Sequence, residues 1–191
     1  MKRLFTPRSL VLVAAVLAAP LAWGHDGHVV GSAAAGFAHP FTGLDHLLAM
    51  VAIGLWATQQ GARAFWAVPL AFVTAMALGA LTGFAGFALP ALEPMIAASV
   101  VVLGLAIASG MRTPVLAGVT IAALFAVFHG NAHGLEAAGA PIAAYLGGML
   151  VATALLHGAG VAGALAVRGG ALRWAGAAVA AGGAGLMLAG V

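Results

Sequence analysis

Residues 92–110 read LEPMIAASVVVLGLAIASG, a stretch that carries one charged side chain and is otherwise apolar or small. An α-helix of this length spans about 28 Å, close to the roughly 30 Å hydrocarbon core of a bilayer. Similar stretches recur along the chain, separated by short breaks that contain Gly, Pro or Arg. The fold class that we predict is therefore all-α, an integral membrane bundle of six transmembrane helices at residues 42–59, 64–85, 92–110, 114–134, 141–167 and 171–190.

The composition supports this class. Of the 191 residues, 64% are hydrophobic and only 6% are charged, whereas soluble domains are about 45 to 50% apolar. The chain has no cysteine, which excludes disulfides, thiolate metal sites and cysteine nucleophiles. Histidine, aspartate, glutamate and methionine remain as candidate metal ligands.

The N-terminus has the pattern of a secretory signal peptide. Lys2, Arg3 and Arg8 precede an apolar run at 10–22 that is short for a spanning helix, and small residues follow it. We expect a signal peptide at residues 1–24 and a six-helix transmembrane domain at residues 25–191. Removal of three cations would bring the formal net charge of +3 to zero, so we expect no nucleic-acid partner.

The other arginines predict the orientation of the bundle. Arg63, Arg112, Arg168 and Arg173 all fall in or beside breaks on one side of the predicted helices. By the positive-inside rule this side faces the cytoplasm. We therefore expect a multi-pass protein of the bacterial inner membrane whose mature N-terminus lies in the periplasm.

Two polar clusters interrupt the apolar sequence. The first reads HPFTGLDH at residues 39–46, and the second reads HGNAHGLE at residues 129–136. The first cluster begins the first predicted helix and the second ends the fourth, so both lie on the same membrane face. Each extends roughly 10 Å along a helix axis, and we expect them to meet.

Within the second cluster, His129, His133 and Glu136 stand at i, i+4 and i+7 and share one helix face. In the first cluster, His39 and His46 share a face if the helix extends back through Pro40, a residue suited to a first helical turn.

Asp45 projects about 100° away from His46 on a helix. It could ligate a metal directly, or it could accept the ring N–H of a histidine and so fix the tautomer of that histidine.

A single histidine at a helix end is commonly a hydrogen-bonded interfacial side chain, and that alternative applies to each of these residues. The joint pattern favours a site, because buried carboxylates without cationic neighbours need a proton, a metal or a histidinium. Imidazole and carboxylate suit divalent first-row metals. The candidate metal ligands are His39, Asp45, His46, His129, His133 and Glu136.

Four further residues are secondary candidates. His25 and His28 would stand at the mature N-terminus, where a free amine and two imidazoles could scavenge metal. His157 lies deep in the fifth predicted helix, as packing or as a later station on an ion path. Met50 follows His46 by one turn and could offer a weak thioether ligand or pack in the core.

These motifs resemble the HupE/UreJ family of small membrane proteins. The resemblance runs through His39-Pro-x-x-Gly43-x-Asp45-His46-x-Leu48-Ala-Met50 and His129-Gly-x-Ala-His133-Gly-x-Glu136, and more weakly through a segment that ends at His157. It implies permeation of Ni²⁺, or Co²⁺, from periplasm to cytoplasm for hydrogenase or urease, with the six candidate ligands as the metal site. The sequence alone does not name the metal.

We therefore expect a nickel permease, not an enzyme, whose partners are the divalent ion and the bilayer, with no tightly bound cofactor. The sequence shows no nucleotide-binding motif. Two alternatives use the same residues: an intramembrane metal-dependent hydrolase, and a metal-binding accessory protein that does not transport. Against the hydrolase, the sequence offers no evident histidine partner for Ser32, Ser99 or Ser109.

Overall fold

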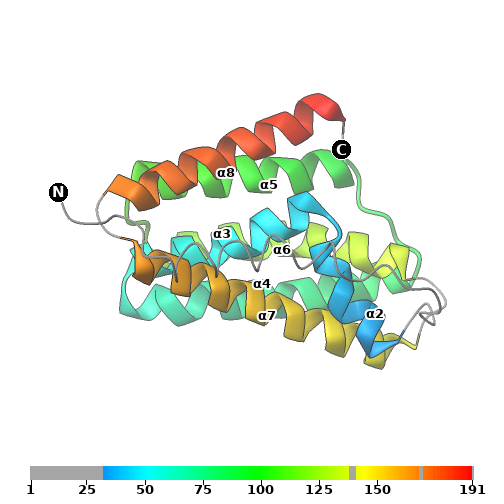
Figure 1. Cartoon of the computed structure of the whole chain (residues 1–191). Coiled ribbons are helices and arrows are strands. Elements are labelled where there is room, and N and C mark those ends of the chain that lie inside the picture. Colours follow the sequence, from blue (N-terminus) through cyan, green and yellow to red (C-terminus); the bar gives the residue numbers. More distant parts are fainter. Residues whose placement is uncertain (1–31, 138–140, 168–169, 191) are drawn as a thin grey trace.

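The computed structural model describes residues 32–137, 141–167 and 170–190, and the regular elements of this part of the chain are all helices (Figure 1). The predicted signal peptide, His25 and His28 lie outside the described residues. The elements are α2 (Ala33–Ala38), the 3-10 turn η2 (His39–Phe41), α3 (Leu44–Gln60), α4 (Ala62–Phe84), α5 (Leu92–Ser109), α6 (Val115–Glu136), α7 (Ile142–Ala166) and α8 (Gly170–Ala189). The six long helices match the six predicted segments to within two residues at every boundary.

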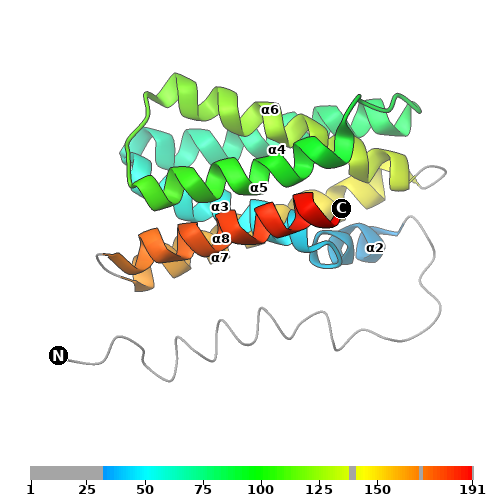
Figure 2. The same ribbon diagram turned by 90° about the horizontal axis from the view of Figure 1, so that it is seen from above.

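The central helix is α3. It packs against α7 on one side and against α5 on the other, while α4 pairs with α6 and α8 pairs with α5 (Figures 1 and 2). Most α3 side chains are consequently buried, including the apolar Met50 and Ile53. Side chains at the start of α3 therefore face other helices, which is where a polar site can be shielded from lipid and water.

Glycines bring α4 and α6 into close contact. A Cβ at Gly130 would overlap the carbonyl oxygen of Met76, and a Cβ at Gly134 would overlap that of Ala80. Close approach through small residues is the usual way in which helices associate in lipid. Each histidine of α6 precedes one of these glycines and is turned about 100° away from α4, which directs His129 and His133 toward α3.

Five helices, α4 to α8, are long and apolar enough to cross a membrane, and there are six such spans if the bent pair α2–η2 and α3 counts as one. Large apolar side chains point outward from the bundle, among them Leu70, Leu116 and Leu188. A soluble domain buries most such residues, whereas a lipid-facing surface exposes them. These features are those of a multi-pass membrane protein.

The chain bends just before α3, so the helix does not extend back through Pro40 and His39 and His46 do not share the helix face that such an extension would give them. The axis of Ala33–Phe41 is bent by 84° from that of Leu44–Gln60. Pro40 lacks the N–H that an α-helix needs and crowds the preceding turn, so α2 ends and a single 3-10 turn follows, in which the Thr42 hydroxyl donates to the His39 carbonyl (2.7 Å). Gly43 is extended and starts α3.

The charged side chains separate to the two ends of the bundle. The carboxylates of the described residues stand where α3 and α5 begin and where α6 ends, and we call this the histidine end. The described arginines stand where α4, α6 and α8 begin, and we call this the arginine end. Those arginines are Arg63, Arg112 and Arg173, and Arg168 lies outside the described residues.

Candidate metal-binding site

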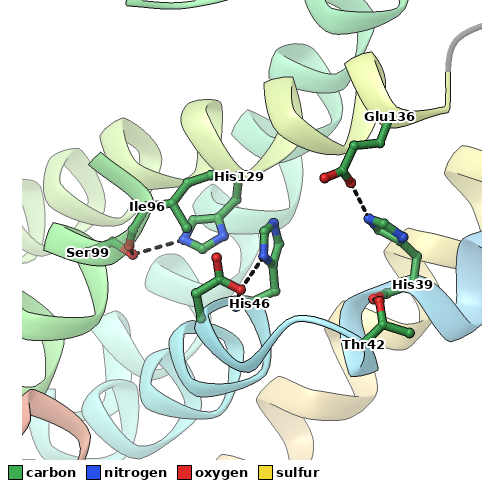
Figure 3. A network of polar contacts seen from close by, with 8 residues as sticks. His39, Thr42, His46, Ile96, Ser99, His129 and Glu136 are labelled. Carbon is green, nitrogen blue, oxygen red and sulfur yellow. Dashed lines mark hydrogen bonds and ion pairs between the residues drawn. The ribbon is translucent and has the colours of Figure 1, made fainter. Parts of the chain in front are cut away.

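The two polar clusters meet at the histidine end, where η2, the first turn of α3 and the last two turns of α6 converge (Figure 3). Nε2 of His39 lies 2.5 Å from Oε2 of Glu136, and the rings of His39 and His133 have centroids 4.7 Å apart. Each of these residues can offer one ligand atom, and these atoms all lie within 4.8 Å of one another. We call His39, His133 and Glu136 the outer group.

A second set of histidines lies deeper. The ring centroid of His46 is 4.8 Å from that of His129 and 4.4 Å from that of His133. All three side chains are buried, and His129 and His133 are fully enclosed. We call His46, His129 and His133 the inner group. Because His133 belongs to both groups, it joins the partly exposed outer group to the buried inner group.

The bend at Pro40 sets the distance between the two groups. The centroids of His39 and His46 are 6.4 Å apart, whereas seven residues of continuous helix would separate them by about 10 Å along the axis. His39 is thus brought close to His46 by the bend, and not by a helix face that the two residues share.

Asp45 fixes the tautomer of His46. Its Oδ1 accepts the backbone N–H of His46 (2.7 Å) and lies 2.8 Å from Nδ1 of the same residue. An ionised carboxylate can only accept hydrogen bonds, so Nδ1 carries the proton and Nε2 keeps its lone pair. That Nε2 is buried and has no hydrogen-bond partner among the described residues. Of the two roles left open for Asp45, this geometry matches the histidine partner.

Gly43 provides the space for this contact. A Cβ at residue 43 would lie 2.7 Å from Oδ1 of Asp45 and 3.1 Å from Nδ1 of His46. Glycine at this position therefore leaves room for the Asp45 carboxylate to lie against the His46 imidazole.

Ser99 fixes the tautomer of His129, which corrects the expectation that this serine lacks a histidine partner. Its hydroxyl donates to the Ile96 carbonyl (2.6 Å), and its oxygen lies 2.9 Å from Nε2 of His129 (Figure 3). Because the serine proton is already used, the oxygen accepts from Nε2–H and Nδ1 keeps its lone pair. Within the described ranges that buried Nδ1 has no partner.

His133 has neither ring nitrogen paired with any group that the structure describes, although the side chain is fully buried. A buried polar group without a partner costs about 1 to 3 kcal/mol. The inner group therefore presents three buried imidazoles, each with at least one nitrogen that is unpaired among the described residues. Imidazole is a ligand that divalent first-row transition metals favour, and the group whose ligand atoms lie close enough together to share one ion is the outer group.

Glu136 differs from the expectation that both carboxylates are buried without cationic neighbours. Its side chain is 53% exposed and contacts His39. Asp45 is more enclosed, with 16% of its side chain exposed, and contacts His46. Each carboxylate thus contacts a histidine, and Glu136 is the more exposed of the two carboxylates.

The remaining candidates are not in these groups. Met50 is fully buried in the apolar core. His157 is buried in α7, and its ring stacks edge-on to that of Phe72, with centroids 5.2 Å apart.

Asn131, for which the sequence predicts no role, is fully hydrogen-bonded in the structure. Its Nδ2 donates to the Thr82 hydroxyl (2.9 Å) and to the Phe87 carbonyl (2.7 Å), and its Oδ1 accepts from the Leu89 N–H (3.0 Å). These bonds hold the α4–α5 connection against α6. The position of this polar residue between two motif histidines could have indicated such a role, because a buried amide needs several hydrogen-bond partners.

Comparison with known proteins identifies the family. The HupE / UreJ protein family model matches residues 13–188. The chain belongs to the HupE/UreJ family. Protein HupE of Rhizobium leguminosarum bv. viciae is 43% identical over 181 residues, which cover 91% of this chain and 94% of that protein. No solved structure matches the chain. The HupE/UreJ match includes both histidine groups and the long helices up to residue 188, and it confirms the resemblance that the motifs indicated.

Proposed function

We propose that this HupE/UreJ protein is a permease that carries Ni²⁺, or Co²⁺, from the periplasm to the cytoplasm for hydrogenase or urease maturation. The observation that carries the proposal is the inner group: three buried imidazoles with free nitrogens inside an apolar helical bundle. A folded protein seldom leaves buried nitrogens unpaired without a purpose. A divalent ion can take up the lone pairs of such nitrogens, and the adjoining outer group already holds its three ligand atoms within 4.8 Å of one another.

The proposed orientation rests on the separation of charge. Arg63, Arg112 and Arg173 stand at the arginine end, which by the positive-inside rule faces the cytoplasm of the inner membrane. The histidine end then faces the periplasm. With the bent pair as one span and a cleaved signal peptide, six helices place both the mature N-terminus and the C-terminus in the periplasm.

The geometry suggests the order of events. The ion first meets the outer group, where Glu136 is half-exposed and can attract a cation. It then passes to the inner group through His133, which both groups share. The membrane potential favours inward movement of a dication by about 4.6 kcal/mol per 100 mV, so uptake needs no nucleotide.

The test is uptake of radioactive nickel by vesicles that contain the purified protein, with Co²⁺, Zn²⁺ and Cu²⁺ as competitors. We expect His46→Ala and His133→Ala to abolish uptake. Leu116→Ala is the matched control, because this α6 residue is exposed on the lipid side. Uptake at the control rate in both histidine variants would refute the site, and binding without flux in the unmodified protein would favour the accessory alternative.

The contact between Ser99 and His129 does not favour the hydrolase alternative. A serine nucleophile would give its proton to the histidine, but here the hydroxyl donates to the Ile96 carbonyl of its own helix. Metal-dependent turnover by the purified protein, with no flux in vesicles, would reverse this assignment.

A further inference from the structure

His157 is a buried histidine that the proposed site does not use. It is 4% exposed, and both of its ring nitrogens lack a hydrogen-bond partner in the part of the chain that the structure describes. A histidine kept only for packing would normally pair at least one nitrogen, since each unpaired buried group costs about 1 to 3 kcal/mol. Leucine would fill a similar space in this apolar surrounding without that penalty.

The ring of Phe72 lies next to both His157 and the inner group. The ring centroid of Phe72 is 5.9 Å from that of His129 and 5.2 Å from that of His157. Phe72 itself is fully buried. A cation that leaves the inner group in the direction of His157 therefore meets the Phe72 ring.

His157 is also deeper than the inner group. His129 lies seven residues from the end of α6 at Glu136, about 10 Å from the histidine end. His157 lies fifteen residues from the start of α7 at Ile142, about 22 Å from the same end. The three rings thus succeed one another from the histidine end toward the arginine end.

The seam between α4 and α7 beside Phe72 also carries polar atoms. The hydroxyl of Thr153, one turn before His157, is fully buried and lies 3.8 Å from Sδ of Met76, one turn after Phe72. Nitrogen, oxygen and sulfur atoms therefore border the ring along two facing helices. A purely apolar seam would present none of them.

The two walls around His157 differ in rigidity. On the α3 side, a Cβ at Gly54 would overlap the His157 carbonyl oxygen, so α3 and α7 are in backbone contact. On the α4 side, Pro69 lies inside the helix three residues before Phe72, where it removes one helical hydrogen bond. Adjustment within α4 is thus confined to the turn around Pro69, because α4 is in backbone contact with α6 at Met76, one turn after Phe72.

We propose that His157 is a second, deeper binding station for the transported divalent cation and that the Phe72 side chain is the gate between this station and the inner group. The inference rests on the proposed transport function. The ring is in place while the ion occupies the inner group and rotates aside to let it reach His157. A binding step before and after a closed ring keeps the pathway from being open at both ends.

The experiment measures two quantities on the full chain: equilibrium Ni²⁺ binding in detergent by titration calorimetry, and Ni²⁺ flux in vesicles. In His157→Leu we expect the Ni²⁺ flux to fall by about tenfold or more. The affinity of the first site, formed by the inner and outer groups, should be unchanged. The melting temperature should stay the same or rise, because two unpaired nitrogens are removed.

The outcomes for His157→Leu separate the two proposals. Flux at the unmodified rate would overturn the second station, and so would a melting temperature that falls together with flux, or a loss of binding at the first site. If the unmodified protein transports Ni²⁺ and His133→Ala does not, any of these outcomes for His157→Leu counts against the second station alone. If the unmodified protein carries no flux, the transport function itself fails.

Phe72 is tested by changing its size in both directions. Phe72→Leu introduces a smaller side chain that obstructs the ion less, so it should raise flux or admit other divalent ions. Phe72→Trp introduces a larger side chain and should lower flux by about tenfold. Both variants should bind Ni²⁺ with unchanged affinity. Equal flux in the two variants, or an equal loss in both, would overturn the gate, because a ring that only positions histidines would respond to either change in the same way.

Discussion

The two ends of the bundle treat buried polar side chains in opposite ways. At the arginine end, Gln60 donates to the Met111 carbonyl (3.1 Å) and accepts from both the backbone N–H (2.7 Å) and the hydroxyl (3.1 Å) of Thr113. At the histidine end, the inner group leaves several ring nitrogens unpaired. The buried Gln60 is thus fully paired at one end, whereas buried histidines at the other end keep unpaired ring nitrogens.

The contrast is not a general looseness of the fold. Eight buried side-chain atoms of the described residues lack a partner, and six of them belong to His46, His129, His133 and His157. The other two are Nε1 of Trp56 and Oε1 of Gln59. Even at the histidine end, Asn131 satisfies both its amide groups. Incomplete pairing is thus concentrated on imidazole, the ligand that divalent transition metals favour.

The largest effect should come from His133→Leu, because His133 belongs to both groups. We expect Ni²⁺ affinity to fall by about a hundredfold or more, since even residues that only support a metal ligand contribute 10- to 100-fold. The melting temperature should not fall, because two unpaired nitrogens are removed. Calorimetric titration and thermal unfolding measure the two quantities. A destabilised variant with normal Ni²⁺ affinity would show that His133 serves stability and not binding.

Gln60→Leu should give the opposite result at the arginine end. Loss of its three hydrogen bonds leaves the Met111 carbonyl and the Thr113 N–H unpaired, which should lower the stability by about 2 to 4 kcal/mol. Ni²⁺ affinity should be unchanged. Unfolding by denaturant in detergent tests this, and a variant as stable as the parent would show that the arginine end is not held by these bonds.

Ser99→Ala examines a smaller contribution within the histidine end. Without the acceptor for Nε2–H, His129 is free to take the other tautomer and the other ring orientation, and we expect about tenfold weaker Ni²⁺ binding. Ser99→Thr keeps the hydroxyl and serves as the matched variant, with affinity restored. If alanine and threonine bind equally well, the hydrogen bond to His129 has no part in binding.

Gly43→Ala should have the smallest effect. The added Cβ would push the flexible carboxylate of Asp45 away from His46, and we expect a loss of about threefold to fivefold in Ni²⁺ affinity, less than that of a deleted supporting residue. Gly158→Ala is the control, because a Cβ there meets no atom within 4 Å. An equal response of the two variants would contradict the steric role of Gly43.

Much of the fold could be predicted from sequence because apolar length alone defines each spanning segment. The six segments and the alternation of their direction also placed the start of α3 and the end of α6 at one end of the bundle. The break at Pro40 could not be predicted in this way, because proline both begins helices and ends them. Local sequence leaves that choice open, and it is settled by packing against α7.

The supporting residues of the site were harder to find than the ligand candidates. His129 and His133 stand out in an apolar sequence, but Ser99 lies thirty residues away from His129 on another helix, and its surroundings in sequence look like ordinary packing. The same holds for Phe72, whose place between two histidines depends on how α4, α6 and α7 meet. Such roles arise from tertiary contacts between helices.

The bend before α3 also changes which helix carries His39. A Cβ at Gly36 would overlap the Tyr145 carbonyl oxygen, and a Cβ at Gly148 would overlap that of Ala33, so α2 is held tightly by α7. His46, in contrast, is fixed to α3. His157 lies in α7 as well, so the helix that holds His39 in place also carries the histidine of the proposed deeper station and connects the two levels of the proposed pathway.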